Sequence, residues 1–193
     1  MIILISSAKN IISKLPLENK RKIALIPNAE LENKLRIKGY ALFLKENGFN
    51  VSIIDLNKFK GNKLYNKLIK YEIIYIVGGN TFVLLQKIRE SEFDKILPKL
   101  LEHGIVYVGQ SAGAVVMGTS IEPTKLLDNP EDATLTNYNG LGYVDFVFIP
   151  HYKNPKYAAK MRQIEKIYSK KFKLRKFTDS EGLIIDNGVI RKI

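Results

Sequence analysis

Cysteine is absent from the 193 residues of this chain, and its absence excludes three kinds of site. A disulfide framework, a thiolate metal site and a cysteine nucleophile all need the missing side chain. Histidine is scarce as well, because the chain holds only two. A covalent catalyst must therefore be another residue type, and an imidazole base must be one of two side chains.

Long hydrophobic runs are also missing near the N-terminus. The apolar run Met1–Ser7 is about seven residues long and has neither a basic flank nor a small-residue cleavage site. A secretory signal peptide or a membrane-spanning helix needs a longer apolar stretch. We therefore expect no membrane partner and a cytoplasmic location.

The overall composition is that of an ordinary globular protein, with 46% apolar and 26% charged residues. The length suits one hydrophobic core, so we expect residues 1–193 to form a single domain. The net charge is +12, which is also a feature of nucleic-acid-binding proteins. However, the lysines are spread along the chain, with one denser stretch at Lys166–Lys176 and no basic groove studded with aromatic residues. We expect a solvated basic surface rather than a nucleic-acid partner.

The first half of the chain alternates between short apolar runs, rich in Ile and Val, and helical patterns. The expected strands are Ile2–Ser6, Ile23–Pro27, Asn50–Leu56, Ile73–Val77 and Ile105–Gly109. The expected helices are Leu31–Asn47, Thr81–Arg89 and Phe93–His103. This alternation predicts an α/β fold with a doubly wound, mostly parallel sheet and helices on both faces.

The second half has a different character. Segment Glu122–Gly142 is polar, holds two prolines and has no sustained period, so we expect a long loop or lid within the domain. After it, Tyr143–Pro150 suits a strand and Ala158–Lys171 suits a helix. The pair Asn187-Gly188 lies between two apolar runs and predicts a closing β-hairpin.

The segment Gly109–Gly113 reads Gly-Gln-Ser-Ala-Gly and fits the pattern Gly-x-Ser-x-Gly. It follows an expected strand and precedes a run of small residues, which is the context of a nucleophile elbow. In such a turn the flanking glycines allow close packing, and the amide of Ala112 points at a developing oxyanion. The alternative is that Ser111 only caps a helix. Because a cap does not need flanking glycines, we favour Ser111 as the nucleophile.

The two histidines differ in their context. His103 lies in the last turn of an expected helix before a glycine, where the helix dipole favours it, so we expect a structural role. His151 follows the apolar run Val147–Pro150, and the strand ends of open α/β sheets are where sites form. We therefore expect His151 to be the base for Ser111.

A third group is needed to orient the imidazole. Asp179 and Glu181 precede a late apolar strand, and both are candidates.

A second glycine motif, Gly78-Gly79-Asn80-Thr81, follows the expected strand Ile73–Val77. Its exposed amides can approach a ligand, so Gly79 is a candidate for a second oxyanion donor beside Ala112. The alternatives are a plain turn with a helix cap, or a phosphate cradle. The patterns Gly-x-Gly-x-x-Gly and Walker A are both absent.

Together these motifs resemble the dipeptidase E family of serine peptidases, the alpha-aspartyl dipeptidases. The resemblance depends on Gly78–Phe82, Gly109–Ala114 and the segment from Gly140 through Phe146 to Tyr152, in this order and spacing. It implies a flavodoxin-like sheet akin to that of class I glutamine amidotransferases, whose elbow carries cysteine where this chain has serine.

The resemblance also implies the site. It assigns Ser111 as nucleophile, His151 as base and Asp179 as the acid, with Gly79 and Ala112 as oxyanion donors. It implies that the substrates are short peptides, which include dipeptides with N-terminal aspartate. It implies no cofactor and no metal ion.

Substrate contacts are expected at Asn80 and Arg162. The chain departs from the aspartyl-specific pattern here, because the stretch from Lys153 to Arg162 lacks the His-Gly element followed by arginine. The sequence leaves the oligomeric state open, and a homodimer is among the assemblies that it allows.

Two other functions are compatible with the sequence. An α/β-hydrolase esterase shares the elbow but places its acid before the histidine, and here the candidates are Glu122, Asp128, Glu131, Asp132 and Asp145. A non-catalytic protein could use the basic surface to bind RNA or an acidic partner.

Overall fold

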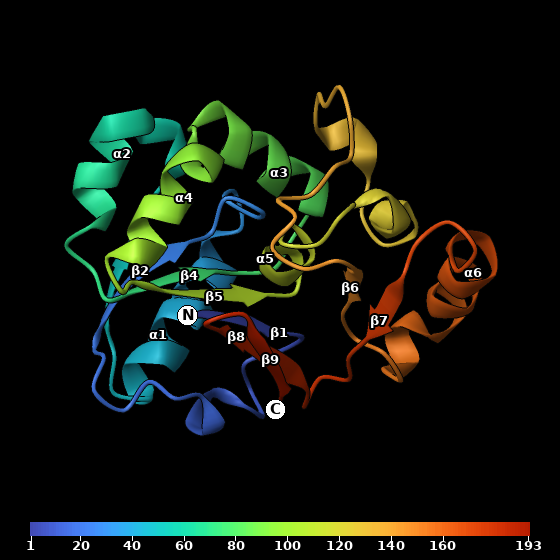
Figure 1. Ribbon diagram of the computed structural model, residues 1–193, viewed down its shortest axis with the longest axis horizontal. Coiled ribbons are helices and arrows are strands. Elements are labelled where there is room, and N and C mark those ends of the chain that lie inside the picture. Colours follow the sequence, from blue (N-terminus) through green and yellow to red (C-terminus); the bar gives the residue numbers. More distant parts are fainter.

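A computed structural model describes residues 1–193, and a seven-stranded sheet lies at its centre (Figure 1). Five strands run parallel: β1 (Ile2–Ile5), β2 (Lys22–Ile26), β3 (Asn50–Ile53), β4 (Ile73–Ile76) and β5 (Val106–Gln110). Two antiparallel strands, β8 (Gly182–Asp186) and β9 (Val189–Lys192), extend the sheet beside β1. The predicted mostly parallel sheet and the predicted hairpin are both confirmed.

The strand order is β3-β2-β4-β5-β1-β8-β9. If β2, β3, β4 and β5 are counted as strands 1 to 4, their order in the sheet is 2-1-3-4, as in flavodoxin-like folds. The next position, which a later strand takes in those folds, is taken by β1. Because β1, β5 and β4 are parallel neighbours, their carboxyl ends lie at one edge of the sheet. That edge is where open α/β sheets form their sites.

Helices cover both faces of the sheet, as predicted. On one face lie α2 (Gly61–Leu68), α3 (Thr81–Glu90), α4 (Phe93–Glu102) and the short α5 (Ala112–Val115), and their apolar side chains pack on residues such as Leu4, Ile26 and Ile76. On the other face lie α1 (Lys34–Glu46) and the segment 8–17, packed on residues such as Ile5, Leu25 and Tyr75. Alternate residues of each strand thus serve two separate apolar cores.

A second, two-stranded parallel sheet stands beside the main one. It pairs β6 (Val147–Ile149) with β7 (Leu174–Lys176), and α6 (Ala158–Tyr168) connects them. The strand expected over Tyr143–Pro150 is therefore shorter, because the amides of Tyr143 and Val144 bond to the carbonyl of Met117 instead of a strand. Sequence reasoning missed β7, whose Leu-Arg-Lys run has no apolar alternation, and it missed α2.

The expected loop Glu122–Gly142 contains only two short 3-10 turns, Glu122–Leu126 and Pro130–Asp132. Side chains of α3 tie it down: Arg89 donates to the carbonyls of Asn137 (3.1 Å) and Asn139 (2.8 Å). The lid is thus fastened to the main body. None of the helices combines the length and apolar character needed to cross a bilayer.

Candidate active site

The elbow at Ser111 joins β5 to α5. Ser111 has φ 51° and ψ −112°, a backbone conformation that a residue with a side chain rarely adopts. A Cβ on Gly109 would overlap the carbonyl oxygen of Gly113, and one on Gly113 would overlap that of Ile76. The two glycines are therefore required for the close contact of strand and helix that holds this strained turn.

The hydroxyl of Ser111 does not cap α5, although the residue occupies the capping position. Its Oγ lies 2.9 Å from Nε2 of His151. The geometry therefore contradicts the simple capping role and matches the expected pairing of serine with histidine.

His151 comes directly after β6 in a left-handed conformation, with φ 62°. Its backbone amide donates to Oγ of Ser6 at 2.7 Å, and its ring stacks on that of Tyr157 at 5.1 Å between centroids. Ser6 follows β1 and is fully buried. The imidazole is thus fixed by a neighbouring aromatic ring and by a hydroxyl from the main sheet.

Asp179 lies on the other side of the imidazole. Its Oδ1 is 2.6 Å from Nδ1 of His151 and also accepts from Oγ of Ser6 at 3.0 Å, while Oδ2 accepts from Asn154 at 2.8 Å. Burial alone would raise the pKa of Asp179, but the hydrogen bonds from His151, Asn154 and Ser6 lower it below the ordinary value. Because an ionised carboxylate only accepts, Nδ1 carries the proton and Nε2 is free to accept from Ser111.

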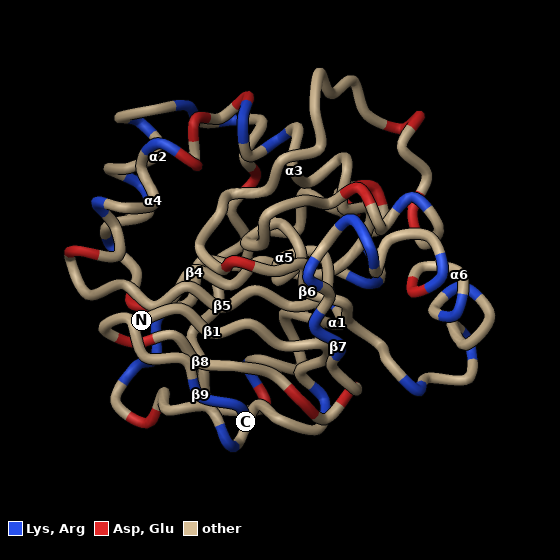
Figure 2. The backbone as a smooth tube through the Cα atoms, turned by 45° about the vertical axis from the view of Figure 1, so that its right-hand side comes forward, with Lys and Arg blue, Asp and Glu red and all other residues tan.

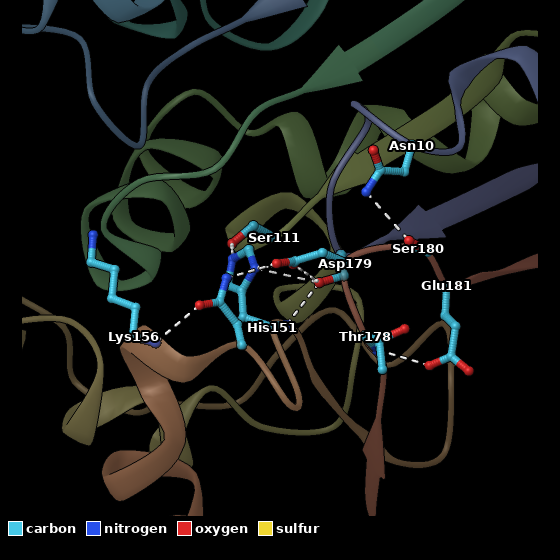
Figure 3. A network of polar contacts seen from close by, with 10 residues as sticks. Asn10, Ser111, His151, Lys156, Thr178, Asp179, Ser180 and Glu181 are labelled. Atoms are coloured by element: carbon cyan, nitrogen blue, oxygen red, sulfur yellow. Dashed lines mark hydrogen bonds and ion pairs between the residues drawn. The ribbon is translucent and has the colours of Figure 1, made fainter.

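Glu181, the other acidic candidate, points away from the histidine (Figure 3). It accepts from the amide of Thr178 at 2.8 Å and pairs with Lys192 at 2.5 Å. The lysine and the Thr178 amide lower the pKa of Glu181 to about 2. Glu181 therefore closes a turn, and Asp179 is the carboxylate at the imidazole.

Gly79 and Ala112 lie in the lining of the cavity that holds Ser111. Gly79 has φ +138°, and a Cβ there would come within 2.5 Å of the Ala29 carbonyl oxygen, so only glycine fits. No backbone or side-chain acceptor of the protein takes its amide proton. Ala112 is the first residue of α5, where an amide has no partner within the helix. Both amides are available to a ligand.

The cavity has a volume of about 350 Å³ and two polar walls. One wall comes from the β2–α1 region, with Glu30, Arg36 and Tyr40, and the other comes from the lid, with Thr124 and Asp128. Ser111, His151 and Tyr157 lie among the remaining lining residues. The structure holds no group of three or more His, Asp or Glu side chains arranged to hold a metal ion.

Of the two predicted substrate contacts, one lines the cavity and the other does not. Asn80 lines the cavity, but its side chain accepts from the amide of Phe82 and donates to Asn129 and Asp132 of the lid. Arg162 is exposed on α6 and is not among the residues that line the cavity. The arginine that does line the cavity is Arg36, on α1.

Several site residues were missed from the sequence. Ser6 stands at the end of the first strand, so the rule that sites form at strand ends could have drawn attention to it once the strand order was known. Asn154 lies in an irregular segment and Tyr157 ends a short 3-10 helix, and nothing in the sequence pattern marks either of them. Asp128 was considered only as a candidate acid of an esterase, not as a residue of this cavity. Their proximity to Ser111 comes only from the tertiary fold.

His103 ends α4, where its Nδ1 lies 2.8 Å from the carbonyl of Lys99, as expected for a structural histidine. The basic stretch of the sequence falls on α6 and β7 (Figure 2). Within it, Lys171 pairs with Glu122 at 2.6 Å and Lys176 pairs with Glu165, while Arg175 lies over the ring of Phe146. Much of this basic surface is thus engaged within the protein.

Comparison with known proteins connects this geometry to a family. The sequence pattern of peptidase family S51 matches residues 3–193. An uncharacterized peptidase of Listeria innocua is 36% identical over 126 residues, which are 64% of this chain and 60% of that protein. A "probable alpha-aspartyl dipeptidase" of Drosophila melanogaster is 38% identical over 90 residues, 46% of this chain and 36% of that protein.

Among solved structures, the crystal structure of a "putative peptidase E protein" from Listeria monocytogenes superposes with a TM-score of 0.87. It is 28% identical, and the alignment covers 100% of this chain and 96% of that one. The family pattern and this structure agree over essentially the whole length of the chain. The chain therefore belongs to peptidase family S51.

Proposed function

We propose that this protein is a serine peptidase that hydrolyses dipeptides through Ser111, His151 and Asp179. The observation that carries the proposal is the continuous chain of contacts from Ser111 Oγ to His151 Nε2 (2.9 Å) and from His151 Nδ1 to Asp179 Oδ1 (2.6 Å). Nucleophile, base and orienting acid in hydrogen-bond contact are the requirements of a serine hydrolase.

In the proposed reaction, His151 takes the proton of Ser111 as Oγ attacks the carbonyl carbon of the scissile peptide bond. The oxyanion accepts hydrogen bonds from the amides of Gly79 and Ala112. His151 then gives the proton to the leaving amine, which departs and leaves an acyl-enzyme on Ser111. Water, deprotonated by His151, attacks the acyl carbon and releases the product acid. Asp179 holds the tautomer and stabilises the imidazolium.

Two observations support a short substrate. The cavity of about 350 Å³ lies between the lid and α1, and its volume is that of a site for a small molecule. One relative is named a "probable alpha-aspartyl dipeptidase". A dipeptide with N-terminal aspartate therefore belongs in the panel of substrates tested.

The test is turnover of a dipeptide panel by wild type and by Ser111→Ala, His151→Ala and Asp179→Asn. We expect cleavage by wild type and losses on the order of 10³-fold or more in each variant. Asp145→Asn is the matched control, because Asp145 is exposed, pairs with Lys173 and precedes His151 as an α/β-hydrolase acid would. Loss of activity in Asp145→Asn with Asp179→Asn unaffected would instead support the esterase arrangement.

A further inference from the structure

Asp128, on the lid, lines the cavity but has no part in the proposed proton transfers. Its Oδ2 accepts two hydrogen bonds from Thr81, from the amide at 3.0 Å and from the hydroxyl at 2.6 Å. Both of these hydrogen bonds end on Oδ2, and no donor of the protein bonds to the other oxygen, Oδ1. One carboxylate oxygen is therefore fixed, and the other is free for a ligand.

The fixed oxygen is held at a well-defined place. Thr81 is the first residue of α3, where the helix dipole favours a negative charge. Asn80, which caps the same helix, donates to the carbonyl of Asn129, the residue next to Asp128, at 2.8 Å. The carboxylate is thus oriented before any ligand arrives, which lowers the entropy lost on binding.

The charges of the cavity leave Asp128 without a cation in contact. Arg36 is the one arginine or lysine in the lining, and it already donates to Glu30 at 2.5 Å and to the hydroxyl of Tyr40 at 2.9 Å. Burial raises the pKa of Asp128, and the hydrogen bonds from Thr81 and the more distant charges of Lys160 and His151 act in the opposite direction. A carboxylate held in a cavity without a cation favours a positively charged ligand.

The chemistry of the proposed reaction also favours a positively charged ligand at Asp128. A negative charge in the cavity where an oxyanion develops opposes the reaction, unless the bound substrate brings a positive charge that neutralises it. The α-ammonium group of a peptide is such a charge. It is attached to the carbon next to the carbonyl of the N-terminal residue, so it stays with the acyl group at Ser111.

We propose, on the basis of the proposed function, that Asp128 binds the free α-ammonium group of the substrate. The substrates are then unblocked dipeptides with uncharged or basic N-terminal side chains. An N-terminal aspartate is disfavoured, because its side chain adds a carboxylate to a cavity whose arginine is already paired.

The experiment separates binding from turnover. Binding of Ala-Leu and N-acetyl-Ala-Leu is measured by calorimetry with Ser111→Ala and with Ser111→Ala/Asp128→Asn. The values of kcat/KM for Ala-Leu, N-acetyl-Ala-Leu, Lys-Leu and Asp-Leu are measured with wild type, Asp128→Asn and the control Glu131→Gln, which changes an exposed carboxylate of the same lid. Labelling by a fluorophosphonate, which has no ammonium group, reports whether Ser111 stays reactive.

We expect preference for the free over the acetylated dipeptide by about 10- to 100-fold, the range of a charge-assisted hydrogen bond. This preference, and the discrimination against Asp-Leu, should nearly vanish in Asp128→Asn while fluorophosphonate labelling is unchanged. The isosteric amide can still accept from Thr81, which preserves the lid. Glu131→Gln should keep the wild-type preference.

Each contrary result has a distinct meaning. Turnover with the preference intact in Asp128→Asn overturns the ammonium site and leaves the peptidase proposal standing. Binding that depends on Asp128 without turnover by wild type supports the ammonium site and contradicts the peptidase proposal. Neither binding nor turnover of any dipeptide contradicts both.

Discussion

The nucleophile and its two partners are held by different physical means. Ser111 stands on the main sheet, where Gly109 and Gly113 leave no space between β5, α5 and β4, so steric contact fixes the elbow. His151 and Asp179 follow β6 and β7 of the small sheet. The hydroxyl of Ser6 connects them to the main sheet, because it accepts from the His151 amide and donates to Asp179. The elbow at Ser111 is thus the packed half of the site, which depends on steric contact. His151 and Asp179 are the polar half, which depends on a few polar contacts between the two sheets.

The largest effect is expected from Asp179→Asn, which changes the polar half. The amide has one acceptor oxygen and one NH2 donor, so it cannot accept from both His151 and Asn154 as the carboxylate does. When the NH2 group faces Nδ1, it favours the wrong tautomer of His151. We expect kcat to fall on the order of 10³- to 10⁴-fold with the fold intact. Steady-state kinetics with a cleaved dipeptide, together with circular dichroism, checks this. A fall below tenfold would remove Asp179 from the orienting role.

Gly113→Ala changes the packed half. The added Cβ would overlap the Ile76 carbonyl, so β4 and α5 must separate. Overpacking of this kind costs about 1–3 kcal/mol, or roughly a 5- to 150-fold fall in the folding equilibrium. Urea denaturation measures it. Gly39→Ala is the matched control, because a Cβ there meets nothing within 4 Å, and equal stability of the two variants would contradict the steric account.

Ser6→Ala removes the contact between the two sheets. The His151 amide loses its acceptor and Asp179 loses one donor, so we expect kcat to fall about 10- to 100-fold while KM changes little. Ser91→Ala is the control, because Ser91 is also buried and its hydroxyl bonds only to carbonyls of α3. If both variants lower kcat equally, the effect of Ser6 is general destabilisation and not positioning.

The smallest expected effect is on the free energy of unfolding, which the ionised carboxylate of Asp128 lowers. Because burial raises the pKa of Asp128 above its unfolded value, ionisation opposes folding at neutral pH, and this opposition fades as the pH falls through the folded-state pKa. Asp128→Asn should therefore raise Tm at pH 7 by on the order of 2 °C, with a difference that shrinks toward low pH. Thermal melts at several pH values measure it, and a lower Tm at pH 7 would contradict the sign.

The sequence predicted the packed half well. The apolar runs around β1, β2, β4 and β5 are buried on both sides of the sheet, so their hydrophobic pattern is strong and local. The elbow motif also contains its own structural reason, since Gly109 and Gly113 make the contacts that their positions in the pattern imply.

The polar half was predicted only in part. His151 and Asp179 were identified by elimination and by resemblance, and their catalytic roles stay predictions. Ser6, Asn154 and Asp128 act through contacts between segments far apart in the chain, so no local pattern predicts those contacts. Arg162 was inferred from its place in the sequence after His151, and the structure places it on the exposed side of α6, outside the cavity lining.

Covalent labelling of the protein tests whether Ser111 is a nucleophile activated by His151. The protein is incubated with a fluorophosphonate and the adduct is located by mass spectrometry of its peptides. We expect one adduct, on Ser111, absent from Ser111→Ala and formed much more slowly in His151→Ala. An adduct on another residue, or equal labelling of wild type and Ser111→Ala, would contradict this role of Ser111.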